Sequence, residues 1–212
     1  MDPKEMREHV IKDAKCSLIL DAAHKVFLEK GYINARIEDI AEAAGFSKPS
    51  IYAYFPDKEA IFLSLSIREI QNMFAKIEEV TSKSENSFRQ ILTNIFEIII
   101  KNFVQTYSYF NTVTNIQSIK KAHEEISKHH ELAENFYEII KKGINLMEGI
   151  IKRAQDKKEI SKACDPSKLS WYILSIIQGI HTRYCFILNK PPDVETEVEH
   201  AINFILNGIS AK

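Results

Sequence analysis

IEDIAEAAGFSKPSIYAYF, the stretch from Ile37 to Phe55, predicts two short helices joined by a tight turn. In its first half the apolar residues recur at the i, i+3, i+4, i+7 spacing of one helix face, at Ile37, Ile40, Ala41 and Ala44. Gly45 then ends the first helix, because glycine takes the left-handed conformation without a Cβ clash. Ser47 is a good N-cap for the second helix, and Pro49 fits its first turn. The pattern is typical of a helix-turn-helix.

The outward face of the second predicted helix suits a DNA groove. At about 100° per residue, Ile51 and Phe55 point back toward the first helix, whereas Pro49 and Ala53 point away from it. The major groove admits a helix and is read by short polar groups, by Lys or Arg, and by apolar contacts to thymine methyls. For this pattern alone, an ordinary helical hairpin with a polar outer surface remains the simpler interpretation.

The flanking residues favour the DNA-binding interpretation over an ordinary helical hairpin. ILDAAHKVFLEKGY precedes the motif at Ile19–Tyr32, and PDKEAIF follows it at Pro56–Phe62. Together with Glu38–Ala41 and Ile51–Phe55, this order closely resembles the DNA-binding domain of the TetR family of bacterial transcriptional regulators. The resemblance covers roughly the first third of the chain. It implies an all-α protein with an N-terminal helix-turn-helix domain and a C-terminal helical domain for ligand binding and dimerisation.

The resemblance also implies DNA-binding residues. Five of them match positions that face base edges or the nearby backbone: Lys48, Pro49, Ser50, Tyr52 and Ala53. Two more, Tyr54 and Lys58, match phosphate-contacting positions.

One departure from the family pattern precedes the motif. Many members place a capping hydroxyl where this chain has Ala35 and Arg36. Because arginine cannot accept a capping hydrogen bond, Asn34 is expected to take over the cap, which leaves Arg36 as a candidate for a phosphate or minor-groove contact. The alternative is a solvated surface arginine, and the position of Arg36 favours the phosphate contact over it.

Composition sets the domain plan. The 212 residues suffice for a DNA-binding domain, expected over 1–64, and a larger domain over 65–212. The 45% hydrophobic content with only six glycines and six prolines indicates a helical globular protein. No apolar run is long enough to span a bilayer and no signal peptide opens the chain, so a cytoplasmic location without membrane contact is expected. Three cysteines without metal or disulfide spacing are expected to stay reduced: Cys16, Cys164 and Cys185.

Charge gives no general attraction to nucleic acid. Residues 1–64 hold nine Lys/Arg and eleven Asp/Glu, a balance of 9 − 11 = −2, whereas DNA-binding domains are often basic. The prediction is therefore local steering by Lys48 and Lys58 at the DNA-facing edge. The N-terminal Lys4, Arg7, Lys12 and Lys15 are interleaved with acids, which favours a solvated segment over added backbone contacts.

Helical periodicity continues along the chain. A first helix is expected from about Asp13 to Lys30, after a frayed start and with Gly31 as its stop. Asp57 predicts the cap of a long helix that runs to about Val80 and connects the DNA-reading head to the rest of the chain. The polar residues 81–87 mark the clearest break.

The second half is also expected to be helical. Phe88–Tyr107 is apolar on nearly every side, which is typical of a central buried helix. A shorter helix over Phe110–Lys121 and a turn within Lys120–Glu131 are expected before the stripe Leu132–Ile151. In that stripe Gly143 and Gly149 indicate close packing or a bend.

The last two predicted helices indicate assembly. Asp165 and Pro166 open a helix to about Leu188, and a final helix covers Val194–Ile209. The first of these has two apolar stripes and therefore needs two packing partners, which predicts an isologous four-helix homodimer interface. The residues expected there are Ile173, Ile176, Ile180, Tyr184, Val198, Ile202 and Ile205.

No catalytic or metal-binding pattern stands out. Paired carboxylates and a glycine-rich phosphate loop are lacking, and His123, His129 and His130 have no metal-ligand spacing, so neither an enzyme nor a cofactor nor a metal is expected. Ligand-binding candidates in the second domain are aromatic residues and inward polar groups, although core packing is the plainer interpretation of each. They are Tyr107, Phe110, Phe136, Tyr137, Met147, Trp171, Gln178 and His181.

These patterns together predict a ligand-responsive transcriptional regulator. The simplest form is a repressor that binds a palindromic operator as a homodimer and is released by a small hydrophobic or aromatic effector. The alternative is an architectural or assembly protein that binds DNA through the same head and senses no small molecule. A pocket in the C-terminal domain would discriminate between the two.

Overall fold

The computed structural model of the chain describes residues 2–82, 86–110, 129–188 and 190–208, with the backbone alone at 106–110, 133, 136, 185 and 186. Across these residues the regular structure is helical, as the all-α prediction requires. Packing divides the chain into two compact units, Met1–Arg68 with Ser108–Asn135, and Glu69–Tyr107 with Phe136–Lys212. The sequence placed the boundary after residue 64; the structure places it after Arg68 and groups Ser108–Asn135 with the first unit.

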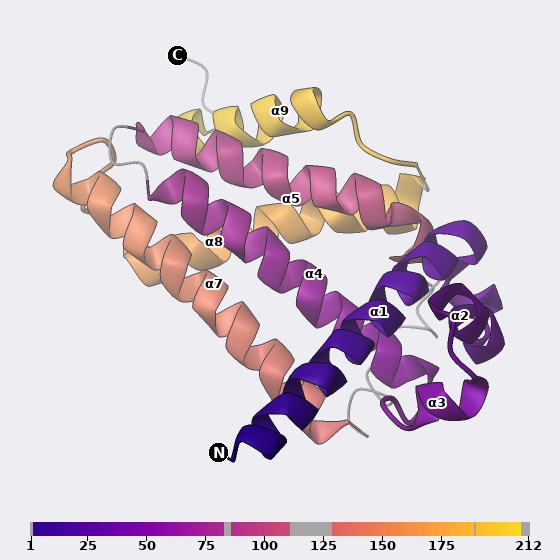
Figure 1. Cartoon of the computed structure of the whole chain (residues 1–212). Helices are drawn as coiled ribbons and strands as arrows, with labels where there is room; N and C mark the ends of the chain where they lie inside the picture. The colour runs from indigo at the N-terminus through magenta and orange to yellow at the C-terminus, as the bar shows by residue number, and fades with distance from the viewer. Residues whose placement is uncertain (1, 83–85, 111–128, 189, 209–212) are drawn as a thin grey trace. The chain divides into compact units, whose positions relative to one another are not determined.

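The first unit is built around three N-terminal helices and the start of a fourth. They are α1 (Pro3–Asn34), α2 (Ile37–Ala44), α3 (Lys48–Tyr52) and α4 (Lys58–Thr81) (Figure 1). Side chains from every one of these helices meet in one core, and six of them have no exposed surface: Ile19, Ala23, Phe27, Ile40, Ile51 and Ile61. Burial of this apolar area is the main force that fixes the two short helices α2 and α3, which are too short to be stable alone.

Helix α1 is longer than its apolar pattern predicts. The expected frayed start is wrong, because α1 begins at Pro3 with Asp2 as its N-cap. The Asp2 carboxylate accepts from the Lys4 backbone N–H at 3.3 Å, and the Asp2 N–H donates to Glu5 Oε2 at 3.0 Å. At the other end Gly31 takes a φ of 72°, which interrupts the regular helix where the stop was expected.

The cap of α2 also differs from expectation. Asn34 does not cap this helix, because its side-chain amide donates to the Lys30 carbonyl in the last turns of α1 at 3.2 Å. Instead Asp39, inside α2, accepts from the Arg36 backbone N–H at 2.9 Å. Asp39 thereby satisfies an N–H at the start of α2 from within the helix, as the acidic member of a capping box does.

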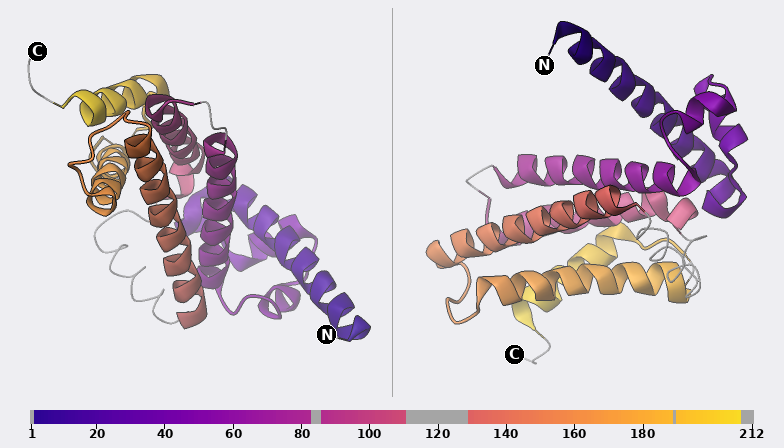
Figure 2. Two further views of the ribbon diagram at one scale, coloured as in Figure 1. Left: turned by 90° about the vertical axis from the view of Figure 1, so that its left-hand side faces the viewer. Right: turned by 90° about the horizontal axis from the view of Figure 1, so that it is seen from below.

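The second unit packs its helices around α5 (Phe88–Phe110). Its other elements are α7 (His130–Asp156), α8 (Pro166–Thr182), the π-helical turn η1 (Arg183–Leu188) and α9 (Val194–Asn207), together with the C-terminal part of α4. In the two views of Figure 2, α5 lies among α4, α7 and α9. Four of its side chains are at most 1% exposed, which confirms the prediction of a central buried helix: Leu92, Ile95, Phe96 and Ile100.

Caps and breaks in the second unit follow the sequence signals. The Asp165 carboxylate accepts from the Lys168 N–H at 2.9 Å, as its place before Pro166 predicts. The predicted helix to Leu188 holds to Thr182 and then widens into η1. Asp193 caps α9 through the Thr196 N–H at 2.8 Å. The short helix expected over Phe110–Lys121 and most of the turn expected within Lys120–Glu131 lie outside the described residues.

Gly143 on α7 marks a close approach to α4. A Cβ at this position would lie 2.4 Å from Cζ of Phe74, so α7 and α4 approach closely here and the Phe74 ring would have to shift to admit a larger residue. Gly149, further along the same helix, is different, since a Cβ there would meet nothing nearer than Nη1 of Arg153 at 3.8 Å. Close packing is thus confirmed at Gly143 and absent at Gly149.

The residues expected at a dimer interface differ in how far their own chain covers them. Ile173, Tyr184, Val198 and Ile202 are 8% exposed or less, so little of their surface is left for a partner. Ile176, Ile180 and Ile205 pack against the same core but are only half-buried, and their place at an interface stays a prediction. The outward surfaces of the same elements hold other large apolar residues, namely Trp171, Tyr172, Ile187, Leu188 and Phe204.

Among the residues that the structure describes, no helix is long and apolar enough to cross a membrane.

Candidate nucleic-acid interface and ligand cavity

The turn between α2 and α3 has the chemistry that its sequence predicts. Gly45 lies in the left-handed region with a φ of 69°, and the next N–H, that of Phe46, closes the end of α2 on the Ala41 carbonyl at 2.9 Å. Ser47 caps α3 by accepting from the Ser50 N–H at 3.3 Å. These local bonds fix where α3 begins.

Helix α3 presents one face to the core and the other to solvent. Ile51 is fully buried and Phe55, just after the helix, is 6% exposed, so this side anchors α3 on the first unit. Lys48, Pro49, Tyr52 and Ala53 are exposed and Ser50 is half-buried, which matches the outward face predicted from helix geometry. A short helix with an anchored inner face and small or polar outer groups fits the major groove.

Two lysines of this region form ion pairs with acidic residues of α2. Lys48 Nζ pairs with Glu38 Oε1 across the turn, and Lys30 Nζ pairs with Asp39 Oδ1 at 2.8 Å. The hydrogen bond from Lys48 lowers the pKa of the Glu38 carboxyl below its ordinary value, and the same bond raises the pKa of Lys48. The Lys48 ammonium also lies 5.9 Å from the centroid of the Tyr52 ring. In the protein without DNA, the main basic group of α3 therefore has an acidic partner.

The other predicted DNA contacts differ in accessibility. Arg36 is exposed ahead of α2, where its side chain can reach outward. Tyr54 is half-buried and has the Lys15 ammonium 5.8 Å from its ring centroid. Lys58 is half-buried at the start of α4, and its ammonium donates to backbone carbonyls at the end of α1.

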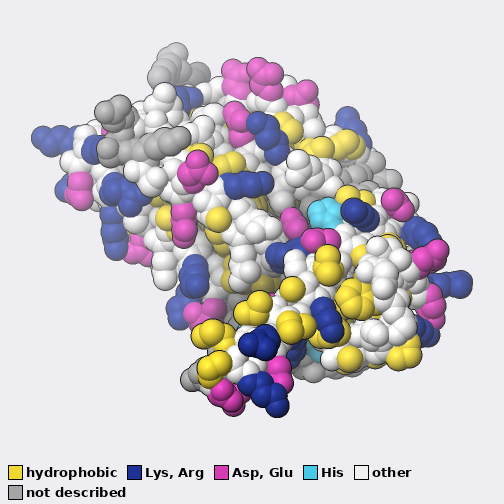
Figure 3. Space-filling model, in the orientation of Figure 1, with side chains coloured by type: hydrophobic (Ala, Val, Ile, Leu, Met, Phe, Trp, Pro, Cys, Tyr) yellow, Lys and Arg dark blue, Asp and Glu magenta, His cyan; other side chains and the backbone are white. Residues whose placement is uncertain are grey.

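Charges of both signs are interleaved on the surface in view in Figure 3, with no single basic area. This agrees with the slightly acidic balance of residues 1–64. DNA binding by this unit must therefore rest on the placement of a few basic side chains.

The predicted ligand-binding residues do not gather at one place among the described side chains. Met147 is 4% exposed and belongs to the core, whereas Tyr137, Trp171 and Gln178 are exposed. His181 is half-buried with its ring centroid 4.6 Å from that of Phe103, and burial lowers its pKa. Three others have side chains outside the description: Tyr107, Phe110 and Phe136.

A cavity opens elsewhere in the second unit, between the end of α4, the start of α5 and the end of α7. Its volume is about 520 Å³. Its lining surface is mostly apolar; the lining residues are Glu78, Thr81, Ser82, Asn86, Phe88, Ile91, Leu146, Ile150, Arg153, Ala154, Lys157 and Glu159. A second cavity of about 550 Å³ shares Phe88 and Glu159 and extends toward Leu169, Ile205 and Leu206. None of the eight predicted ligand-binding residues lines either cavity.

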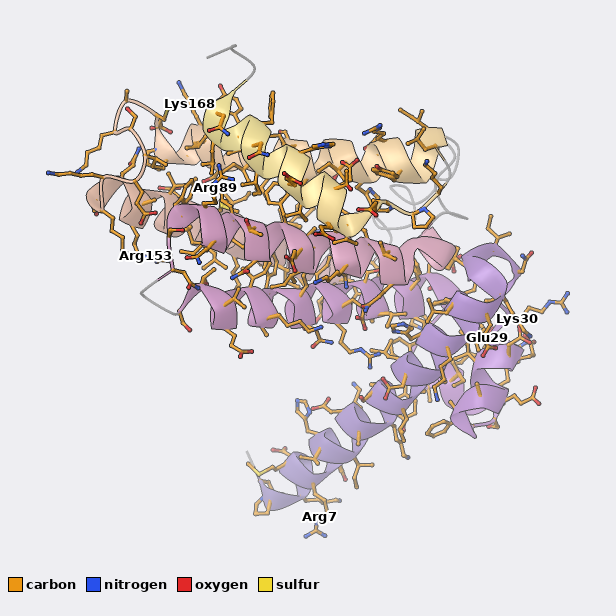
Figure 4. The ribbon with its side chains drawn as sticks, turned by 90° about the horizontal axis from the view of Figure 1, so that it is seen from above. Arg7, Glu29, Lys30, Arg89, Arg153 and Lys168 are labelled. Atoms are coloured by element: carbon orange, nitrogen blue, oxygen red, sulfur yellow. The ribbon has the colours of Figure 1, made fainter. Side chains whose placement is uncertain are left out.

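Hydrogen bonds hold the segment after α7, which lines part of both cavities, in place. The buried Gln155 amide donates to the carbonyls of Ser161 at 3.0 Å and Cys164 at 2.7 Å, which folds residues 157–164 back on the helix. The Glu159 carboxylate accepts from the Phe88 N–H and so caps α5. Figure 4 labels Arg89, Arg153 and Lys168 at this end of the unit.

Sequence reasoning missed Arg153 and Lys157 as candidate ligand contacts. Both stand in the polar run that follows the apolar stripe of α7, where a basic residue is typical of a solvated helix end. The signal in the sequence is weak, because the cavity arises from three segments that are distant in the chain. Among the described residues, no group of three His, Cys, Asp or Glu side chains is placed to hold a metal ion.

Comparison with known proteins agrees with this geometry. Residues 19–65 match the family model described as bacterial regulatory proteins, tetR family. An uncharacterised helix-turn-helix transcriptional regulator of Bacillus subtilis, YuxN, is 33% identical over 91 residues, which is 42% of this chain and 31% of that protein. The fatty acid metabolism regulator protein of Bacillus subtilis is 27% identical over 154 residues, 73% of this chain and 75% of that protein.

Solved structures show the same fold. The transcriptional regulator FadR from Bacillus subtilis, crystallised in complex with stearoyl-CoA, superposes with a TM-score of 0.71 at 24% identity, over 92% of this chain and 99% of that one. The fatty acid degradation regulator FadR from Bacillus halodurans gives a TM-score of 0.72 at 23% identity, over 93% and 97%.

Proposed function

The chain belongs to the TetR family of bacterial regulatory proteins, and from this premise we propose that it is a ligand-released repressor that binds a palindromic operator as a homodimer. The observation that carries the proposal is the two-sided α3. Ile51 and Phe55 fix the helix on the first unit, while Lys48, Tyr52 and Ala53 remain exposed. An outward face of this kind has no use in a core and suits a major groove.

Each outward group has a chemical role in the groove. Lys48 donates to guanine O6 and N7 or to a phosphate, the Tyr52 hydroxyl bonds a base edge, and the Ala53 methyl contacts a thymine methyl. Arg36, which lies ahead of α2, contacts the phosphate backbone of the DNA. Such a contact fixes the register of the protein on the duplex without reading the base sequence.

A homodimer would supply two reading helices. The outward surfaces of α8, η1 and α9 expose Trp171, Tyr172, Ile187 and Phe204, each more than half exposed in the single chain. Large exposed apolar side chains on consecutive elements offer apolar area to a partner, and a twofold pairing would bury the same surface of both copies. Half-sites about 34–36 Å apart would then meet the two α3 helices on one side of the duplex.

The cavities of the second unit favour an effector over the architectural alternative. Both volumes lie within the roughly 300–1,000 Å³ typical of small-molecule sites. Apolar lining at Ile91, Leu146 and Ile150 suits a long apolar chain. Arg153 and Lys157, which share the lining with Glu78 and Glu159, supply the basic groups for an anionic head. The stearoyl-CoA complex of a protein with the same fold supports this class, and we propose a long-chain acyl thioester.

Selection from randomised duplex DNA tests the proposal. The full-length protein should enrich an inverted repeat whose half-sites lie about one helical turn apart. Enrichment without symmetry, or retention of DNA that does not depend on sequence, would contradict specific binding by a dimer.

A further inference from the structure

The C-terminal end of α1 is held by the first turn of α4. Gly31 interrupts α1 with a φ of 72°, and the last carbonyls of a helix have no partner within the helix. The Lys58 ammonium donates to the Tyr32 carbonyl at 2.8 Å and to the Ala35 carbonyl at 3.0 Å, with the Ile33 carbonyl at 3.4 Å. Three acceptors thus face a group that has three N–H bonds.

A second pair of residues reinforces this contact. The Tyr32 hydroxyl donates to Glu59 Oε1 at 3.1 Å, one residue after Lys58. The Lys58 ammonium lies 4.5 Å from the centroid of the Tyr32 ring, over the electron-rich face that attracts a cation. Tyr32 and Lys58 are both half-buried, and Ala35 is 2% exposed. The ammonium therefore sits in a site formed by backbone oxygen atoms and an aromatic ring.

The place of this contact links it to DNA recognition. Ala35 lies next to Arg36, whose N–H begins the capping of α2, and α2 leads through the Gly45 turn into α3. A cation at the negative end of the α1 dipole is favourable, and it offsets the cost of withdrawing the ammonium from water. To reach a phosphate, the Lys58 ammonium would have to move away from these carbonyls. The half-buried carbonyls would then lose the donor that Lys58 supplies.

We propose that Lys58 is a positioning residue rather than a phosphate ligand: its ammonium closes the end of α1 and thereby sets the direction in which the chain enters α2. The helix-turn-helix keeps its orientation on the first unit because α1 and α4 are tied at this point. DNA affinity depends on Lys58 through the shape of the head.

The salt dependence of DNA binding separates the two roles. Loss of a phosphate contact reduces the slope of log K against log salt by about 0.9 for each contact. If Lys58 instead keeps the head in its binding-competent shape, its loss lowers the fraction of competent heads, which lowers affinity by that fraction and leaves the slope unchanged. The test uses the full chain, the duplex selected by the wild type, and the variants Lys58→Met and Arg36→Gln over a series of salt concentrations. Arg36→Gln is the matched control, because the Arg36 side chain is exposed.

Lys58→Met should bind the duplex about fivefold to tenfold more weakly at each salt concentration, with the wild-type slope, and should unfold about 2–8 °C lower. Arg36→Gln should lower the slope and keep the unfolding temperature. A reduced slope for Lys58→Met overturns the proposal, and so does wild-type affinity together with wild-type unfolding.

Lysine reactivity in the wild type gives an answer even if Lys58→Met does not fold. With limiting acetylating reagent, Lys58 should react more slowly than the exposed Lys25 in the free protein, and its rate should not change on DNA. A Lys58 that reacts as readily as Lys25 and is protected by the duplex would be a phosphate ligand, contrary to the proposal.

Discussion

Lys48, the first residue of the reading helix, forms an ion pair with Glu38 of the preceding helix, although both side chains are about half exposed at 47% and 57%. The pair has two consequences for DNA binding. Lys48 must leave a carboxylate before it can contact a base or phosphate, and Glu38 places a negative charge beside the incoming duplex.

Removal of the Glu38 charge should strengthen DNA binding. Glu38→Gln frees Lys48 and removes repulsion with phosphate, so affinity for DNA should rise, and only modestly because the pair is exposed to solvent. Anisotropy titrations at fixed salt measure the change. In a Lys48→Ala background the gain should shrink, because the partner is gone; an equal gain in both backgrounds would show that the pair does not restrain Lys48.

Acid should remove the two ion pairs of this region. The pKa values of Glu38 and Asp39 are lowered from 4.5 and 3.8, mainly by the hydrogen bonds from Lys48 and Lys30. A lowered folded-state pKa contributes stability that is present above the unfolded value and is lost as the pH falls through the folded one. The contribution of these pairs to the unfolding temperature should therefore be constant at pH 6–8 and be lost below about pH 4. In Glu38→Gln this decline should be smaller; an identical decline would contradict the assignment.

The outward face of α3 should carry sequence recognition. Tyr52→Ala and Lys48→Ala should each weaken binding to the selected duplex by about 1–3 kcal/mol if the contact is direct. Tyr137→Ala is the matched control, since this tyrosine is 64% exposed on α7 in the second unit and is expected to leave DNA affinity unchanged. Wild-type affinity in both α3 variants would show that another surface reads the DNA.

Charges on the outer surfaces of α8 and α9 should separate the subunits. Trp171→Glu with Phe204→Glu places charges where a twofold partner would bury them, which is strongly unfavourable without a counter-charge. Both positions are more than half exposed in the single chain, so the fold should persist. Sedimentation at micromolar concentration should show a wild-type dimer and a monomeric variant; a wild type that sediments as a monomer contradicts the proposed assembly.

Two glycines of α7 should respond in opposite ways to alanine. Gly143→Ala brings a Cβ to 2.4 Å from the Phe74 ring and should destabilise the fold by about 1–3 kcal/mol. Gly149→Ala meets only the end of the Arg153 side chain at 3.8 Å, so the gain in helix propensity should stabilise by up to about 1 kcal/mol. Urea denaturation measures both. Equal effects at the two sites would show that α7 and α4 pack loosely at Gly143.

The helix-turn-helix can be predicted from local sequence signals. Gly45, Ser47 and Pro49 act within a few residues of their own positions, so the turn and the outward face of α3 can be predicted without the tertiary structure. The start of α1 was missed because residues 3–15 bury no side chain in the core, and only the Asp2 cap with Glu5 indicates a helix there.

Assembly and ligand binding were harder to predict for a physical reason. Periodicity shows that Ile173 and Ile202 are apolar, but it does not tell a core face from a partner face, and the structure places both in the core. The cavity is a gap between α4, α5 and α7, and its shape depends on how distant segments meet. Composition directed attention to aromatic residues, whereas the place of Arg153 and Lys157 in the cavity lining could be found only in three dimensions.

Coupling between ligand and operator is the central claim, because a ligand with equal affinity for the free and DNA-bound protein shifts nothing. The direct measurement is isothermal titration of stearoyl-CoA into the full-length protein, alone and saturated with the selected duplex. Linkage requires that DNA weaken stearoyl-CoA binding by the same factor by which stearoyl-CoA weakens DNA binding, and about fivefold to 150-fold is expected. Equal affinities for stearoyl-CoA with and without the duplex, or no stearoyl-CoA binding at all, would contradict a repressor released by a long-chain acyl thioester.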